Sequence, residues 1–358
     1  MTTSHRPIPR FIRCLLFVLV SVLPTLALAQ SPATETGALS VANPGIDLWR
    51  EVRQREMPAS GYSQVQGTDT GVLINPYGET WRKFRMQQLL VYGGYALGGT
   101  LLFVIAFYLI RGKVPLQAGP SDKKLPRFTV SERITHWFNA FVFLFLALSG
   151  LVMLFGRPVL LPLLGPEIFS VLASASKEGH NLFGPLFILA LSLLFFHFVR
   201  RNIYQRGDLT WLLKGGGIIG KKHVPSNFFN MGEKSWFWML MLVGGVTAAT
   251  GVVLLFPVFG LGREWMELAH AAHTITALSL LMVTIGHIYI STLGMESAID
   301  GMTTGYCDLN WAREHHDWWA QRCEEEGKVV SAAEAAAIHG LGTPPGAPRQ
   351  GMAEEAGK

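Results

Sequence analysis

Charged residues are scarce in this chain of 358 residues. Asp, Glu, Lys and Arg together make up 15% of the sequence, against about a quarter in a typical soluble domain. Apolar residues make up 49%, and the mean hydropathy is +0.30. This balance excludes a disordered chain, a coiled coil and an ordinary soluble enzyme, and it indicates a membrane protein.

Cysteines are almost absent, and the three present, Cys14, Cys307 and Cys323, form no CxxC motif. A thiolate metal cluster, a zinc knuckle and a covalently attached c-type haem are therefore disfavoured. The formal net charge is +5, of which three arginines in the N-terminal leader supply +3. The remaining charge gives no support to nucleic-acid binding.

The first 29 residues have the pattern of a secretory signal peptide. Three arginines precede an apolar stretch, and Ala27-Leu28-Ala29 forms an A-x-A cleavage pattern before Gln30. An uncleaved signal anchor is the alternative, and both place the following segment, 30–88, outside the cytoplasm. This segment is polar and rich in Gly, Pro, Thr and Gln, so we expect a small, mostly extended periplasmic region there.

Five apolar runs each approach the ~20 residues that a helix needs to cross ~30 Å of hydrocarbon. They are 89–110, 134–156, 180–199, 236–259 and 269–293. Because backbone groups must be satisfied inside lipid, these runs predict helices rather than strands. The expected fold is an all-α integral membrane protein, with a four-helix transmembrane bundle at 134–293 and one extra N-terminal transmembrane helix at 89–110.

Lys and Arg residues cluster in two of the connecting segments. Segment 111–133 has six and segment 200–235 has seven, whereas the segments that alternate with them have two and one. The positive-inside rule therefore places 111–133, 200–235 and the tail, 294–358, in the cytoplasm of a bacterial inner-membrane protein. Three basic residues just before the first run, Arg82, Lys83 and Arg85, oppose this bias but are outnumbered.

The tail carries three tryptophans and two adjacent histidines. Trp311, Trp318 and Trp319 predict an interfacial amphipathic segment. His315 and His316 are expected to be solvated. The last ~25 residues are rich in Ala, Gly, Glu and Pro, and we expect them to be disordered.

The last four apolar runs contain no Asp, Glu, Lys or Arg, and their ionisable residues are histidines. Ionisable groups at membrane depth are costly and mark functional sites. Histidine is also the commonest metal ligand and a common axial ligand of haem. The six histidines in these runs are His136, His180, His197, His270, His273 and His287.

Spacing sorts four of these histidines into two pairs. His273 and His287 are 14 residues apart, which places them about 40° apart around a helix and about 21 Å apart along it. They therefore share a face near opposite membrane surfaces. The second run begins on the cytoplasmic side with His136, and the third begins on the periplasmic side with His180. The sequence predicts two bis-histidine sites, His136 with His287 on the cytoplasmic side and His180 with His273 on the periplasmic side.

The other histidines suit these sites less well. His270 lies about 100° off the face of His287, so we expect it to be interfacial, and His197 to lie at a cytoplasmic helix end. A lone histidine near a helix end is most often a hydrogen-bonding residue, but four that agree in face, depth and pairing favour a cofactor. Zinc is disfavoured because the ligands split into two pairs, and no further Cys or carboxylate completes a tetrahedron.

Small residues beside the pairs leave room for a planar macrocycle. Gly150 lies 14 residues after His136, at the level of the outer site, and Gly184 lies one turn after His180. The absence of a CxxCH motif makes a bound haem noncovalent, and two axial imidazoles leave oxygen no open position. The sequence therefore predicts two b haems that transfer electrons across the membrane.

Two haems that carry electrons across the membrane need an electron donor at one end and an acceptor at the other. The sequence has no flavin, nicotinamide or iron–sulfur motif, so we expect the donor to be a partner subunit. The expected acceptor is a quinone, the lipid-soluble electron carrier. Asn230 and the backbone amide of Gly232, on the cytoplasmic side, suit hydrogen bonds to a quinone, although a polar turn that caps a helix is as consistent. Arg133, one turn before His136, suits a haem propionate or a positive-inside anchor.

Several motifs resemble the gamma subunit, a b-type cytochrome, of membrane-bound respiratory formate dehydrogenases. They span about 125–320 and comprise FTVSERITHW at 128–137 with ALSG at 147–150, GHNLFG at 179–184, NMG at 230–232 and HIY at 287–289. The resemblance implies a four-helix core with two b haems held by His136, His180, His273 and His287, and a quinone site at Asn230 and Gly232. It also implies an iron–sulfur beta subunit as the periplasmic donor and a molybdenum or tungsten alpha subunit that oxidises formate.

Two alternatives stay open. Related b-type cytochromes of nickel–iron hydrogenase and thiosulfate reductase share the core plan, so formate is inferred from the resemblance alone. An alternative of another class is a haem-free membrane anchor or a transporter that uses histidines as a proton relay. The chain also departs from the shortest family members in its leader, its 30–88 region and its first apolar run.

Overall fold

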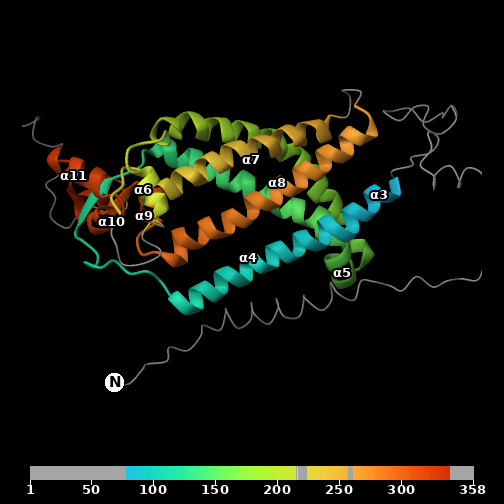
Figure 1. Cartoon of the computed structure of the whole chain (residues 1–358), viewed down its shortest axis with the longest axis horizontal. Coiled ribbons are helices and arrows are strands. Elements are labelled where there is room, and N and C mark those ends of the chain that lie inside the picture. The colour runs from blue at the N-terminus through green and yellow to red at the C-terminus, as the bar shows by residue number, and fades with distance from the viewer. Residues whose placement is uncertain (1–77, 215, 217–223, 257–260, 339–358) are drawn as a thin grey trace, which may run out of the picture. The chain divides into compact units, whose positions relative to one another are not determined.

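Helix dominates the part of the chain that the computed structural model describes, which is residues 78–214, 216, 224–256 and 261–338 (Figure 1). The predicted all-α membrane fold is confirmed for these residues. The predicted signal peptide, residues 30–77 of the predicted periplasmic region and residues 339–358 of the tail lie outside them.

Four helical segments within these residues are long and apolar enough to cross a membrane. The first runs from α3 (Gly78–Lys83) through a π-helical turn (Phe84–Leu89) into α4 (Leu90–Arg111). The second is α5 (Val130–Phe198), the third is α7 (Met231–Leu255), and the fourth is α8 (Arg263–Tyr289), which continues as a π-helical turn to Gly294.

Helix α5 is 69 residues long and holds both the second and the third predicted runs. Its two arms meet at Gly165, where φ is 75° and ψ is 168°. Only glycine adopts this combination readily, and Pro166 further disfavours helical geometry at the residue before it. The segment that connects the two predicted runs is thus helical on both sides of Gly165.

The N-terminus of α5 is closed by a capping box. The Thr129 side chain accepts a hydrogen bond from the Glu132 amide, and the Glu132 carboxylate accepts one from the Thr129 amide. Arg201 holds the same carboxylate at 2.7 Å. Because the cap fixes where the helix starts, it also fixes the position of His136, about two turns further on.

The chain divides into two compact units. The first comprises, among the described residues, 78–102, 142–188, 245–256 and 261–282. A Cβ atom at Gly93 would lie 2.8 Å from Leu278 Cδ1, so this glycine lets α4 approach α8 closely. The Thr247 hydroxyl donates to that of Thr276 at 2.8 Å and links α7 to α8.

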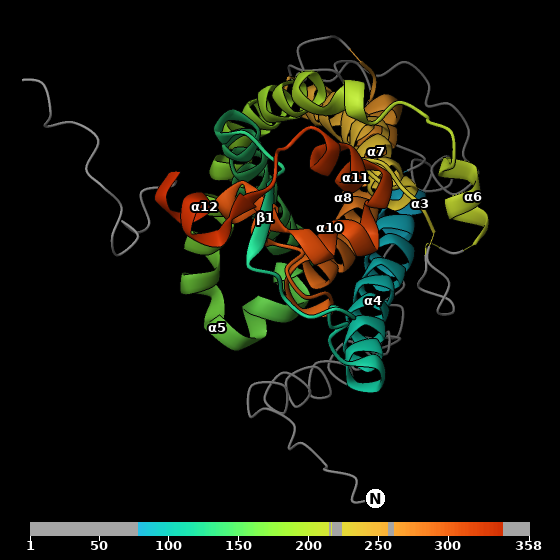
Figure 2. The ribbon, with the colours of Figure 1, turned by 90° about the vertical axis from the view of Figure 1, so that its left-hand side faces the viewer.

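The second unit comprises 103–141, 189–244 and 283–338 where these are described, and it contains a small antiparallel sheet. Its strands are β1 (Lys123–Pro126), β2 (Tyr306–Asp308) and β3 (Val330–Ser331), in the order β2-β1-β3. Leu125 pairs with Cys307 and Lys124 with Val330. The surrounding helices are α9 (Asp300–Thr304), labelled in Figure 1, and α10 (Leu309–His315), α11 (Asp317–Glu325) and α12 (Ala332–Ile338), labelled in Figure 2.

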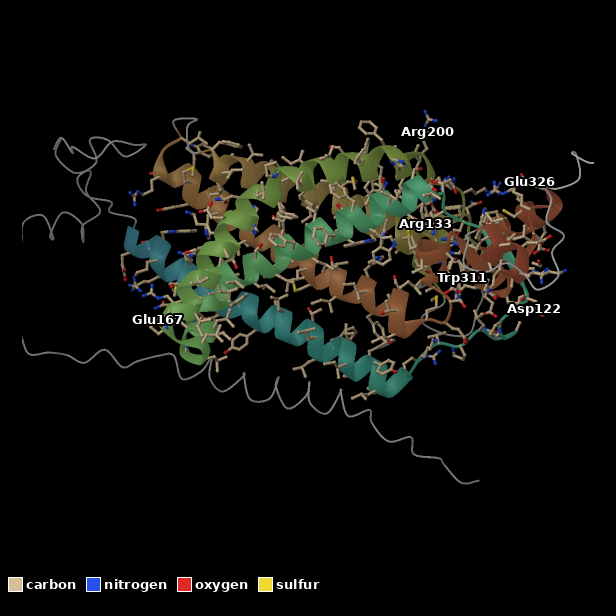
Figure 3. The ribbon with its side chains drawn as sticks, turned by 180° about the vertical axis from the view of Figure 1, so that it is seen from behind. Asp122, Arg133, Glu167, Arg200, Trp311 and Glu326 are labelled. Atoms are coloured by element: carbon tan, nitrogen blue, oxygen red, sulfur yellow. The ribbon has the colours of Figure 1, made fainter. Side chains whose placement is uncertain are left out.

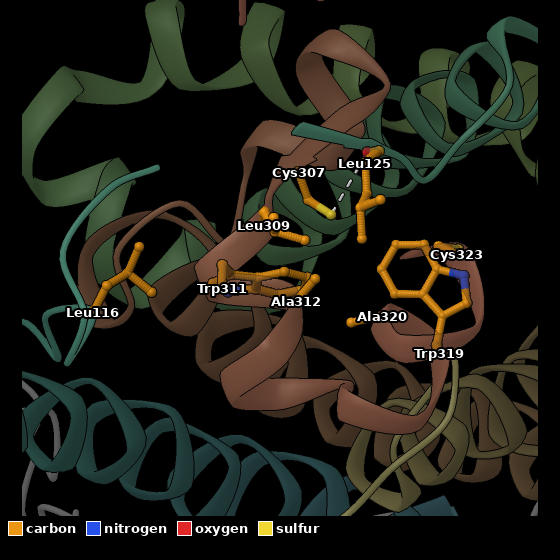
Figure 4. Close-up of a cluster of buried hydrophobic side chains, with 9 residues drawn as sticks. All are labelled: Leu116, Leu125, Cys307, Leu309, Trp311, Ala312, Trp319, Ala320 and Cys323. Atoms are coloured by element: carbon orange, nitrogen blue, oxygen red, sulfur yellow. Dashed lines mark hydrogen bonds between the residues drawn. The ribbon is translucent and has the colours of Figure 1, made fainter. Parts of the chain in front are cut away.

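The sheet and these helices, residues 112–127 and 295–338, form a sheet module with its own apolar core (Figure 4). Trp311 and Trp319 are buried in it, whereas Trp318 is 38% exposed. Figure 3 places Trp311 in the same lobe as Asp122. The predicted interfacial position is therefore wrong for Trp311 and Trp319, because the pairing of β2 with β1 gives these side chains a protein core to enter.

The sheet module also encloses two thiols, Cys307 and Cys323. Burial raises the pKa of Cys307 to about 12 and also raises the pKa of Cys323. Neither is a thiolate near neutral pH, so neither reacts while the module is folded.

We expect Leu125→Ala to destabilise the sheet module by about 2–5 kcal/mol, because this fully buried side chain would leave a cavity. A maleimide labels Cys307 and Cys323 only when the sheet module opens, so the labelling rate in the membrane-bound protein should rise in this variant. Ile338→Ala, at a position that is 66% exposed, is the matched control and should leave the rate unchanged. Equal labelling of Leu125→Ala and the wild type would contradict this core.

Candidate functional site

The first unit brings His180 of α5 together with His273 of α8. Their ring centres are 6.1 Å apart, and the ring planes are inclined at 73°. The His273 Nδ1–H donates to the Thr247 carbonyl oxygen at 2.9 Å, since a carbonyl oxygen can only accept. The proton of His273 therefore lies on Nδ1, and Nε2 keeps its lone pair.

Ser149 gives His180 the same tautomer. The Ser149 hydroxyl donates to the Phe145 carbonyl oxygen at 2.8 Å, so its own oxygen accepts from His180 Nδ1 at 2.9 Å. Nε2 of His180 is left as a lone-pair donor. An Nδ1–H held by a fixed acceptor is the usual support of a metal-binding histidine.

Glycines lie against both rings of this pair. A Cβ atom at Gly150 would lie 3.4 Å from Cε1 of His180, and one at Gly251 would lie 3.2 Å from Cε1 of His273. At Gly184 a Cβ would meet nothing within 4 Å. Gly150 and Gly184 were expected beside the site, whereas Gly251 was missed because only the packing of α7 on α8 shows its position.

The second unit brings His136 of α5 together with His287 of α8. Their ring centres are 6.3 Å apart, and the planes are inclined at 57°. The His287 ring stacks on Trp236 at 5.3 Å, and the edge of Trp137 meets His136 at 5.2 Å. Nδ1 of His136 is buried and has no hydrogen-bond partner within the described part of the chain.

The spacing within each pair fits one metal ion held from two sides. Two imidazoles bound to opposite faces of an ion through bonds of about 2.0 Å have ring centres about 6 Å apart. Within the described ranges, no three His, Cys, Asp or Glu side chains gather to hold an ion. Each pair thus offers two ligands only, which suits a haem iron whose other four positions belong to the macrocycle.

The remaining histidines lie elsewhere. His270 packs edge-on against Trp81 at 5.5 Å, and its Nδ1 is buried without a partner among the residues described. His197 Nδ1 lies 2.9 Å from the Leu193 carbonyl oxygen of its own helix. Neither ring takes part in the two pairs.

The two residues predicted to contact a quinone lie at the start of α7. The Asn230 side-chain oxygen accepts from the Glu233 amide at 3.0 Å, and the Glu233 carboxylate accepts from the Asn230 amide at 2.9 Å. This is a capping box, so the capping role considered for the turn is present. It uses the oxygen of the Asn230 amide and leaves its NH2 group available.

Arg133, the residue considered for a haem propionate, contacts the protein backbone. Its Nη1 donates to the Thr303 carbonyl oxygen at 2.7 Å, while its Nε is buried without a partner in the described structure. Trp137 Nε1 similarly donates to the Met302 carbonyl oxygen at 3.0 Å. Both side chains therefore tie the start of α5 to α9.

A buried polar cluster in the second unit was not expected from the sequence. Nη2 of Arg127 donates to the Phe228 carbonyl oxygen at 3.0 Å, to Glu233 at 3.1 Å and to Nε2 of His316 at 3.2 Å. Five aromatic rings surround its guanidinium at 4.8–5.8 Å, from Phe128, Phe228, Phe229, Trp311 and Trp319.

His316, expected to be solvated, is 1% exposed within this cluster, so that prediction is wrong. Its Nδ1–H donates to the Asn227 carbonyl oxygen at 2.8 Å, which leaves Nε2 to accept from Arg127. Burial and the neighbouring Arg127 charge hold the pKa of His316 well below its usual range. The neutral ring therefore joins the sheet module to the segment before α7, a contact that only the tertiary fold creates.

The chain is similar to cytochrome b556 subunits of formate dehydrogenases. The formate dehydrogenase cytochrome b556(fdo) subunit of Escherichia coli K12 is 28% identical over 198 residues, which cover 54% of this chain and 90% of that protein. The nitrate-inducible cytochrome b556(Fdn) subunit of the same strain is 27% identical over 209 residues, 57% of this chain and 94% of its own length. A formate dehydrogenase cytochrome b556 subunit of Haemophilus influenzae is 25% identical over 209 residues, covering 56% and 83%.

A family profile described as prokaryotic cytochrome b561 matches residues 127–305, half of the chain. The matched segment begins at Arg127, the residue after β1, and ends at Gly305, the residue after α9, and it holds both histidine pairs. The chain therefore belongs to the prokaryotic cytochrome b561 family.

Proposed function

We propose that this chain is the membrane cytochrome b subunit of a respiratory formate dehydrogenase. It carries electrons from a periplasmic iron–sulfur subunit through two b haems to a quinone reduced near the cytoplasmic face. The observation that carries the proposal is the presence of two histidine pairs, with ring centres 6.1 and 6.3 Å apart, in a cytochrome b561 chain. The names of the relatives support formate as the substrate of the complex.

The proposed topology places the N-terminal region in the periplasm and the tail in the cytoplasm of a bacterial inner membrane. The excess of Lys and Arg in 111–133 and 200–235 supports it. His180 and His273 then serve the periplasmic side, and His136 and His287 the cytoplasmic side. Helix α8 contributes one ligand to each pair, 14 residues apart along a continuous helix.

When bound between the two imidazoles of each pair, a haem would supply a carrier that takes up and releases one electron. The protein's part is to hold four Nε2 lone pairs in place. Thr247 and Ser149 fix the tautomer and orientation of His273 and His180. Gly150 and Gly251 let these rings lie directly against helix backbone.

Formate oxidation is assigned to the partner alpha subunit, and it yields two electrons, one proton and carbon dioxide. Reduction of the quinone to a quinol consumes two electrons and two protons. The Asn230 NH2 group and the Gly232 amide, one of the first N–H groups of α7 and so without an intrahelical acceptor, are the proposed donors to the quinone. Proton uptake on the cytoplasmic side, with release in the periplasm, would build a proton-motive force.

We expect His273→Ala to lose one of two b-type haems and keep the other, because the two pairs are separate sites. Haem content per chain and the reduced-minus-oxidised spectrum of the purified complex measure this. His270→Ala, three residues away on the same helix, is the control and should retain both haems. Loss of both haems or of neither in a folded His273→Ala protein would contradict the pairing, and a haem-replete preparation without a b-type band would reject the cytochrome function.

We expect Asn230→Ser to weaken quinone binding without loosening the start of α7. Serine caps a helix about as well as asparagine, but its short hydroxyl cannot replace the NH2 donor. Loss of one hydrogen bond of about 0.5–1.5 kcal/mol should raise the KM for quinone by about 2- to 12-fold.

Formate-dependent quinone reduction by membranes that contain the intact complex gives this KM. Haem content and melting temperature should match those of the wild type. An unchanged KM would leave Asn230 with its capping role alone and would remove it from the proposed quinone site.

A further inference from the structure

A short helix, α6 (Asp208–Leu213), lies against the start of α7 in the second unit. A buried ion pair holds it there, since Lys234 Nζ of α7 lies 2.7 Å from Asp208 Oδ2. Lys234 is 1% exposed and Asp208 is 6% exposed. The same carboxylate oxygen accepts from the Gln205 amide at 2.7 Å, which fixes the approach to the helix.

Helix α6 carries Trp211 directly onto the proposed quinone contacts. A Cβ atom at Gly232 would lie 2.8 Å from Cη2 of the Trp211 ring and 3.2 Å from the Asn230 side-chain oxygen. The same edge of the indole blocks the Cβ position of Gly216. The benzene edge of Trp211 is thus lodged between two glycine backbones and beside the Asn230 amide.

The rest of α6 has the exposure pattern of a helix that faces lipid. Trp211 is half-buried, whereas Leu209, Leu212 and Leu213 are 55%, 51% and 78% exposed. Exposed leucines beside a tryptophan, in a segment that begins where a membrane-spanning helix ends, favour a position at the membrane surface. A lipid-soluble molecule that reaches Asn230 and Gly232 from the bilayer would meet this helix.

We propose that Trp211 lines the quinone site and sets its affinity by stacking on the planar ring of the quinone. Its anchored edge fixes the indole beside Asn230, and its half-buried state leaves part of the ring surface open. An indole offers the largest aromatic face of any side chain and binds a flat ring at little conformational cost. This inference rests on the proposed function, because it takes Asn230 and Gly232 as quinone contacts.

The ion pair between Asp208 and Lys234 acts in this arrangement as a positioning element. It fixes α6 on α7 and so fixes where the indole lies. The absence of a side chain at Gly232 also gains a reason, because any Cβ there would displace the Trp211 ring.

Two substitutions at one position separate stacking from packing. Trp211→Phe keeps an aromatic face, and Trp211→Leu keeps an apolar side chain without one. Leu212→Ala, the adjacent exposed position on α6, is the matched control. The intact complex in membranes is reduced with dithionite, and the reoxidation of its b-type band by menadione, a naphthoquinone without a tail, is followed at increasing menadione concentration.

We expect Trp211→Leu to raise the menadione concentration for half-maximal rate by about 3- to 10-fold, the range that an aromatic contact supplies, with the maximal rate nearly unchanged. For Trp211→Phe and Leu212→Ala, the menadione concentration for half-maximal rate should stay within about twofold of the wild-type value. Haem content and melting temperature should be equal in all four proteins.

Other outcomes overturn the inference in distinguishable ways. If the menadione concentration for half-maximal rate is the same in Trp211→Leu and the wild type, Trp211 does not contact the quinone. If both Trp211 variants reoxidise more slowly at every menadione concentration and have a lower melting temperature, Trp211 serves packing alone. In either case the proposed function stands. If menadione fails to reoxidise the wild-type band, the quinone function itself is rejected, and the role of Trp211 with it.

Discussion

An unprotonated Nε2 atom on each paired histidine is the constraint on which the two proposed haem sites depend. A protonated imidazole could not bind a metal ion, and in an apolar bundle it would also be a charge without solvent. In the first unit, Thr247 and Ser149 accept the Nδ1 protons of His273 and His180 and thereby free Nε2. The glycines beside the rings serve the same end, because they let the helices approach without pushing the imidazoles apart.

In the second unit, the start of α7 is held by residues that lie far from it in the sequence. Arg127, from the strand-bearing segment before α5, reaches Glu233 at the start of α7 and His316 in the sheet module. Glu233 in turn caps the same helix end as Asn230. The proposed quinone contacts therefore lie on a turn that the sheet module stabilises, so the module supports the proposed site as well as the fold.

The helical membrane fold and the placement of the histidines were open to prediction, because both depend on local properties of the sequence. Apolar runs of the right length, and a 14-residue spacing on one helix face, are readable without a structure. The structure adds the distances between the ring centres of each pair, 6.1 and 6.3 Å, which fit one metal ion bound between the two rings, and their role as haem ligands stays a proposal. The sheet module, Gly251, Trp211 and the burial of His316 depend on contacts between distant segments, which no local pattern contains.

The most direct test is the electron paramagnetic resonance spectrum of the oxidised complex, which reports the axial ligands of ferric haem. The account predicts two low-spin ferric haems, each with the signature of two imidazole ligands, and the loss of one of them in His273→Ala. A high-spin ferric signal from the native complex, or a single low-spin haem in the haem-replete wild type, would contradict the claim that the four histidines hold two irons in pairs.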